Sequence, residues 1–192
     1  MNSQTLAIEH LQLNMRWVNR TLRKAVTVQA KIVAALQRHD VTPLCVSDEQ
    51  VEQLLQQVNN KLCYLIDHSG DLSHEECEIE QQLREQAAKQ GTVLPLVAMT
   101  EQLQLTEFEK RAVLLCLAPE LHRGYGRILA YIHDDLNSQA PTIGLLCSLL
   151  AASEEQWLQH RKTLSVYGRL RRLGLLLTQG DVNQEQQLIC RL

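Results

Sequence analysis

The chain has 192 residues, of which 45% are hydrophobic and only 4% are aromatic, and its net charge at pH 7 is −3. This length suits one large domain or two small ones, and the hydrophobic content excludes an intrinsically disordered chain. The scarcity of aromatic residues favours packed helices over an aromatic-rich β-sandwich, and the small net charge gives no indication of a nucleic-acid or membrane partner.

The cellular compartment is inferred from the cysteines and from the apolar runs. The N-terminal residues MNSQT are polar, and no uninterrupted apolar run approaches the roughly 20 residues that a membrane helix needs. The six cysteines are far apart in sequence, which is typical of reduced thiols. We therefore expect a cytoplasmic protein with no membrane segment; the cysteines are Cys45, Cys63, Cys77, Cys116, Cys147 and Cys190.

The N-terminal half is predicted to be helical. From Gln4 to Gln37, apolar residues recur at three- and four-residue steps, which predicts one long helix, either an ordinary bundle helix or a coiled-coil-like arm that pairs with another subunit. Capping boxes at Ser47 and Ser73 predict two further helices. Gly91 interrupts the pattern, so we predict a helical domain over residues 1–90 and a second domain over residues 91–192.

The C-terminal half is predicted to be a winged-helix-like module. Two apolar runs at its end, Leu173–Thr178 and Gln187–Leu192, read as a β-hairpin, the wing. The fold class is therefore mainly α, with a helical hairpin or bundle followed by the winged-helix-like module and its small C-terminal β-hairpin. The helices expected before the wing are residues 94–103, 106–117, 125–136, 141–150 and one that begins at Ser153.

The sequence lacks the motifs of common enzymes. No Gly-Lys dipeptide occurs, so no G-x-x-x-x-G-K-[ST] phosphate loop is possible, and neither a G-x-S-x-G elbow nor an H-E-x-x-H pair is present. Cys63, His68, His74 and Cys77 fall within fifteen residues, but their spacing matches no common zinc finger. We therefore predict a non-catalytic chain with no cofactor and no metal.

Two charged segments are candidate partner-binding sites. The basic one contains Arg161, Lys162, Arg169, Arg171 and Arg172 with no acidic residue between them. Such residues contact phosphates in a DNA-binding winged helix or an acidic surface in a protein partner. The sequence favours the protein, because the helix taken as the candidate recognition helix, residues 141–153, has no Arg, Lys, Asn or Gln to read bases and is apolar enough that we expect it to pack inside the domain.

The geometry of the arginines next to the wing also yields an expectation. If they lie in an extended segment, alternate side chains point to opposite faces. Arg169 and Arg171 should then point together and Arg172 away, with all three exposed.

The acidic segment runs from Asp67 to Glu80 and has six acidic residues and no Lys or Arg. Asp71, Glu75 and Glu76 are candidates for docking a basic protein segment. Alternatively, the two glutamates only favour the N-terminus of a helix, where acidic residues are stabilised by the helix dipole.

Four pieces of the sequence together resemble one protein family. They are LCVSDEQVEQLL at residues 44–55, FEKRAVLLCLAPELHRGYGRILAYIHDD at 108–135, APTIGLLCSLL at 140–150 and LSVYGRLRRLGLL at 164–176. In this order they resemble the helical and winged-helix region that precedes the ATPase core of certain bacterial AAA+ ATPases, some of which are encoded with extracellular contractile injection systems.

The resemblance implies a region that ends before the ATPase core, so that ATP and Mg²⁺ belong to that core and not to this chain. It also implies three kinds of partner: a protein substrate or injection-particle component, the ATPase core itself, and further copies in a hexamer. The alternative is a DNA-binding winged-helix regulator.

Overall fold

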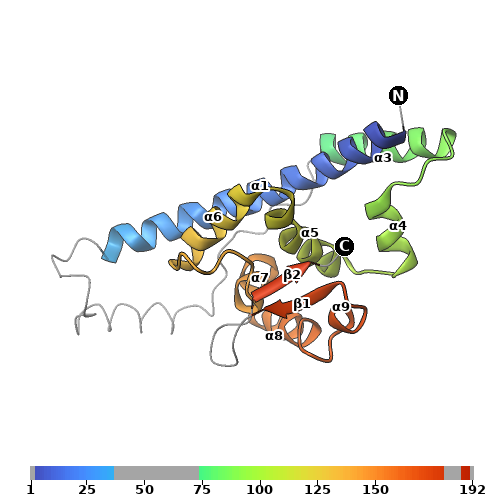
Figure 1. The fold of residues 1–192 in the computed structure, drawn as a ribbon. Helices are drawn as coiled ribbons and strands as arrows, with labels where there is room; N and C mark the ends of the chain where they lie inside the picture. The colour runs from blue at the N-terminus through green and yellow to red at the C-terminus, as the bar shows by residue number, and fades with distance from the viewer. Residues whose placement is uncertain (1–2, 37–73, 180–186, 191–192) are drawn as a thin grey trace.

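The computed structural model describes residues 3–36, 74–179 and 187–190. The described part is mainly helical and ends in a two-stranded antiparallel sheet (Figure 1), as the sequence predicted. Its elements are α1 (Ser3–Leu36), α3 (His74–Lys89), α4 (Pro95–Gln102), α5 (Glu107–Leu121), α6 (Arg123–His133), α7 (Ile143–Leu150), α8 (Glu154–Thr163), α9 (Arg169–Arg172), β1 (Leu176–Gln179) and β2 (Gln187–Cys190).

The long N-terminal helix is confirmed. Helix α1 runs for 34 residues, contacts α3, α5 and α6, and lies lengthwise along the upper edge of the molecule (Figure 1). Its pairing with another subunit stays a prediction. The helix expected after Ser47 lies outside the described residues.

Two clusters of buried side chains hold the helices together. The smaller one joins the first turns of α1 to α3 through Leu6, Leu13, Leu83, Ala87 and Leu94. The larger one joins the middle of α1, including Val18 and Leu22, to α5, α7 and the sheet. The division at residues 88–92 stays a prediction, but α1 contributes to the core on both sides of it.

Helix α5 is the centre of the larger cluster. The predicted capping box is confirmed: Thr106 accepts a hydrogen bond from the Glu109 amide, and the Glu109 carboxylate accepts one from the Thr106 amide. All residues from Ala112 to Cys116 are buried, because α1, α6, α7 and β2 pack around this helix. Pro119, expected to end this helix or begin the next, lies inside the last turn of α5.

The next helices begin and end at specific capping residues. His122 starts α6 by accepting a hydrogen bond from the Gly124 amide at 3.1 Å, and Asp134 ends it with a left-handed φ of 54°. Thr142 accepts from the Leu145 amide at the start of α7. The two helices lie within a few residues of the predicted ranges 125–136 and 141–150, and the structure identifies the capping residues that set their ends.

A polar cluster centred on Glu80 joins three helices. The Glu80 carboxylate of α3 lies 2.8 Å from Arg84, 3.5 Å from His10 of α1 and 4.0 Å from Lys110 of α5. The contact from His10 is the largest cause of a lowered pKa, and Arg84 and Lys110 add to it against the opposing effect of burial. Together these contacts lower the pKa of Glu80 from 4.5 to about 2.

We expect this cluster to make stability depend on pH. A carboxyl group whose pKa is lower in the folded state than in the unfolded state stabilises the fold above its unfolded pKa, and this contribution is lost as the pH falls toward the folded pKa. The free energy of unfolding should therefore decrease between about pH 4.5 and pH 2. In Glu80→Gln the free energy of unfolding should lack the part of this decrease that comes from Glu80. At neutral pH it should be lower than in the unchanged chain by on the order of 2 kcal/mol.

Urea unfolding at several pH values measures this effect. Glu85→Gln is the control, because Glu85 lies exposed on the same helix. The same acid dependence in Glu80→Gln as in the unchanged chain would contradict the prediction.

A second prediction tests the core of α5. Leu115 is 1% exposed, so Leu115→Asp would bury a carboxylate without a partner and should cost several kcal/mol, much of the stability of a domain. Leu121→Asp on the same helix is the control, because Leu121 is 45% exposed. Thermal melts should show a much lower melting temperature for Leu115→Asp and little change for Leu121→Asp. Equal melting temperatures for the two variants would show that the Leu115 environment accepts charge.

Candidate functional site

Helices α7 and α8 form a helix–turn–helix pair. Only Ala151, Ala152 and Ser153 connect them, and Ser153 caps α8 by accepting from the Gln156 amide at 3.2 Å. The indole of Trp157 donates to the Ser148 hydroxyl at 3.4 Å and so ties α8 onto α7. A short turn and direct side-chain contact are what a helix–turn–helix unit requires.

The wing follows this pair. Strands β1 and β2 are antiparallel, with Leu176 opposite Cys190 and Gln179 opposite Gln187. The β2 strand also bridges to Thr142, directly before α7, and the Leu188 amide donates to the Pro141 carbonyl at 2.7 Å. The start of α7 is thereby fixed to the wing. The loop expected between the strands lies outside the described residues.

The structure corrects which helix holds the recognition position. Residues 141–153 were the candidate, but α7 is the first helix of the pair. Its packing inside the domain, which the sequence predicted, is confirmed, because Leu145, Leu146, Cys147, Ser148 and Leu149 are buried there. The second helix of such a pair is the one that enters a groove or meets a partner. That helix is α8, in which no residue is buried.

The exposed charge on helix α8 changes from acidic in its first turn to basic in its last turn. Glu154 and Glu155 lie exposed in its first turn, and Arg161 and Lys162 lie exposed in its last turn. The guanidinium of Arg161 lies 5.4 Å from the centre of the Trp157 ring, within the range of a cation–π contact. The acidic turn is stabilised by the positive end of the helix dipole and the basic turn by its negative end.

On a second face, α8 borders a cleft of about 520 Å³ that is lined by both polar and apolar side chains. Gln156, Gln159 and Thr163 line it from α8, and Glu107 and Arg111 line it from α5. The rings of His160 and Phe108 stack with their centres 3.7 Å apart and join the two helices beside this cleft. A separate apolar groove of about 370 Å³ lies between α1, α4 and α5 and is lined by residues such as Ile8, Met99 and Leu117.

The three arginines next to the wing lie in a short helix and not in an extended segment, which is a second correction. Arg169, Arg171 and Arg172 belong to α9, and only Arg172 is exposed. Arg169 donates to the carbonyls of Leu103 and Gln104 at the end of α4. A cation at the C-terminus of a helix satisfies its free carbonyls and is favoured by the dipole.

Arg171 is also turned inward. Its Nη2 donates to the Thr178 hydroxyl of β1 at 2.9 Å, while its Nη1 is buried without a hydrogen-bond partner among the described residues. The expected exposure of Arg169 and Arg171 is therefore wrong, because both side chains fill hydrogen-bonding roles inside the module. Arg161, Lys162 and Arg172 are the members of the basic segment that reach solvent.

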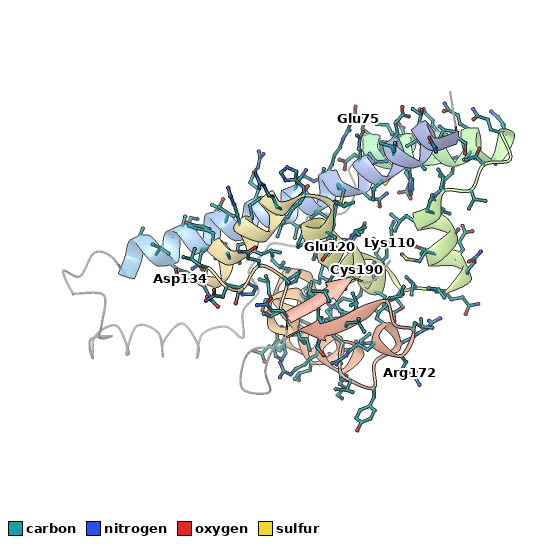
Figure 2. All side chains as sticks on the ribbon, in the orientation of Figure 1. Glu75, Lys110, Glu120, Asp134, Arg172 and Cys190 are labelled. Carbon is teal, nitrogen blue, oxygen red and sulfur yellow. The ribbon has the colours of Figure 1, made fainter. Side chains whose placement is uncertain are left out.

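The acidic candidates also differ in whether their side chains are exposed. Asp71 lies outside the described residues, and Glu75 is exposed in the first turn of α3 (Figure 2). Glu76 is only 7% exposed, because both of its carboxylate oxygens accept from Arg20 of α1, at 2.5 and 2.7 Å. Glu76 therefore holds α3 onto α1 and is not part of an exposed docking surface.

Metal-ligating side chains are dispersed among the described residues, and three of the thiols there are buried. Within residues 3–36, 74–179 and 187–190, no group of three or more His, Cys, Asp or Glu side chains is placed to hold a metal ion. Burial raises the pKa of the Cys147 and Cys190 thiols to about 11, which keeps them protonated and unreactive at neutral pH. None of the helices in this part of the chain is long and apolar enough to cross a membrane.

Comparison with known proteins agrees with this architecture. The family model described as "Winged helix domain, variant" matches residues 5–191. The chain belongs to this winged helix family. No curated protein and no solved structure matches it. Winged helix domains bind nucleic acids or proteins, so the family establishes a binding module without naming the partner.

Three exposed hydrophobic residues on either side of α9 were not predicted from the sequence. Val166 and Tyr167 precede α9, and Leu173 follows it; these side chains are 60%, 86% and 44% exposed. The available signal was the rare aromatic residue beside Gly168 in a chain with four tyrosines. Apolar residues near a strand are ordinarily assigned to the core, so Tyr167 and its neighbours were not identified as exposed.

We expect the two inward arginines to stabilise the domain and the outward one not to. Arg169→Ala and Arg171→Ala should each lower the free energy of unfolding by about 1–3 kcal/mol, because the carbonyl acceptors of Leu103 and Gln104 and the hydroxyl of Thr178 lose a charged donor. Arg172→Ala should change it by less than about 0.5 kcal/mol. Urea unfolding of the three single variants compares these costs, and equal losses at all three positions would be inconsistent with the inward hydrogen bonds.

Proposed function

We propose that this winged helix domain is a non-catalytic protein-recognition region of a AAA+ ATPase. It would recruit a protein substrate or a component of an injection particle to the motor, and the ATPase core and further copies in a hexamer would be its other partners. ATP and Mg²⁺ would bind to the core and not to this chain, and the cellular location would be the cytoplasm. The four sequence pieces that resemble the region before such a core support this assignment.

The charge pattern of α8 is the observation that favours a protein partner over DNA. In a DNA-reading helix–turn–helix, the N-terminal residues of the second helix approach the base edges between the phosphate backbones. In α8 these residues are Glu154 and Glu155, whose carboxylates would be repelled by phosphates. A protein surface, which can present either charge, has no such conflict.

A DNA-binding regulator remains the second candidate because of the other end of α8. Arg161 and Lys162 are exposed in the last turn, and Arg172 is exposed nearby in α9. With only these three cations and two inward arginines, the contact with phosphates would be small. The regulator hypothesis therefore predicts weak binding of duplex DNA, with an affinity that falls steeply as the salt concentration rises.

Capture of partner proteins tests the proposed function. The immobilised chain should retain proteins encoded next to its own gene from a lysate of cells that express them, and deletion of residues 1–192 from the full ATPase should change which substrate it processes. Retention of duplex DNA at low salt without any co-encoded protein would instead support the regulator.

We also expect the isolated chain neither to bind nor to hydrolyse ATP. Cradling the phosphates of ATP needs a glycine-rich loop and its lysine, and the chain has no Gly-Lys pair. Isothermal titration calorimetry should show no saturable heat at micromolar ATP, and saturable binding there would contradict the non-catalytic assignment.

A further inference from the structure

The edge formed by the end of α8, the following turn and α9 exposes apolar side chains that a folded domain normally covers. Tyr167 is 86% exposed and Val166 is 60% exposed in the turn, and Leu173 is 44% exposed directly after α9. The three side chains fall within eight residues of the chain, on either side of the single turn of α9. We call this surface the α8–α9 edge: Lys162, Val166, Tyr167, Arg172 and Leu173.

The turn that carries Tyr167 is held in place by close backbone contacts. The Gly168 amide donates to the Ser165 carbonyl at 2.8 Å, and the Ser165 amide donates to the Lys162 carbonyl at 3.2 Å. A Cβ atom on Gly168 would lie 1.9 Å from the Thr163 carbonyl oxygen, so the turn requires glycine. On either side, Leu164 and Leu170 are fully buried and anchor the segment. Tyr167 is therefore presented outward by a fixed turn.

The α8–α9 edge is also positively charged. Lys162 and Arg172 are exposed, and no Asp or Glu occurs between Gln156 and Gln179. Arg172 projects at the lower edge of the molecule (Figure 2). No described carboxylate pairs with either cation, whereas the inward Arg169 and Arg171 have hydrogen-bond partners.

We propose that the α8–α9 edge binds an acidic segment of a partner protein that also carries apolar side chains. This inference rests on the proposed function and specifies the chemistry of the partner. Tyrosine and arginine are, with tryptophan, the side chains most enriched among those that supply the binding energy of protein interfaces, and the aliphatic Val166 and Leu173 can add apolar contacts. The cations provide charge complementarity and attract an acidic segment before contact.

Nucleic acid fits this edge less well. A phosphate backbone offers nothing apolar for Val166 and Leu173 to contact, and two exposed cations would neutralise few phosphates. An acidic segment with leucine or phenylalanine side chains satisfies both properties of the surface at once.

Selection from a displayed library of short random peptides on the intact chain tests the proposal. The enriched peptides should carry net negative charge together with large apolar residues. Fluorescence polarisation with the most enriched peptide should show binding weakened at least about tenfold by Tyr167→Ser and by Arg172→Glu, and weakened further by added salt. Both positions are exposed, so thermal melts of these variants should match the unchanged chain.

Two variants elsewhere on the surface provide matched controls. Leu136→Ser removes an apolar side chain that is 85% exposed after α6, and Arg123→Glu reverses an exposed charge at the start of α6. Both should change the peptide affinity less than about twofold. Poly-L-glutamate should bind more weakly than the selected peptide, because it lacks apolar side chains.

Several outcomes would overturn the proposal. If the selected peptides are neutral or basic, if polyglutamate binds as tightly, or if the Tyr167 and Arg172 variants bind normally, the α8–α9 edge is not the site. Protein capture by the chain would then still support the proposed function. If no peptide is enriched and duplex DNA binds in a manner that Arg172→Glu abolishes, both the inference and the proposed function fail.

Discussion

The buried helix α5 is the constraint on which the rest of the structure depends. Five consecutive residues from Ala112 to Cys116 are buried, so no side of this stretch faces water. A helix that is buried all round must be enclosed by neighbours, and here α1, α6, α7 and β2 enclose it. This enclosure fixes where α1, α6, α7 and β2 lie around α5, and α8 packs on the outside of α7.

This arrangement explains why α7 and α8 differ so much. Helix α7 packs on α5 and is covered in turn by α8, so it is almost wholly buried and serves as a support. Helix α8 is the outer of the two, is held to α7 by Trp157 and to α5 by the stacked His160 and Phe108, and keeps its charged side chains in solvent. A recognition surface on a rigid helix is better defined than one on a loop, because packing fixes the side chains that present it.

The charged side chains of the domain divide into those that hold elements together and those that face solvent. Glu76 with Arg20, and Glu80 with His10 and Lys110, attach α3 to α1 and α5. Arg169 closes the end of α4, and Arg171 reaches β1. These groups are costly to bury alone and are stable because their partners come from other elements. The exposed charged residues include those at the two ends of α8 and on the α8–α9 edge, where a partner can reach them.

The sequence by itself determined the longer helices, the caps at Thr106 and Ser153, and the wing. The three- and four-residue spacing along α1, the Thr106–Glu109 capping box and the two apolar runs at the C-terminus are local signals, and local hydrogen bonding made them reliable. The prediction of an extended segment for the arginines of α9 was wrong. Four residues are too few to show a helical period, and the run resembled the start of a strand.

Only the tertiary structure decided which charged residues are available to a partner. Glu76 is kept from solvent by Arg20, and Arg169 is turned inward by the carbonyls of Leu103 and Gln104. In both cases the partner lies more than fifty residues away along the chain. The exposure of Tyr167 likewise depends on the turn closed over Thr163 and anchored by Leu164 and Leu170. Burial is a property of packing between distant segments, so the sequence specified the elements and their capping, and the packing of those elements specified the surface.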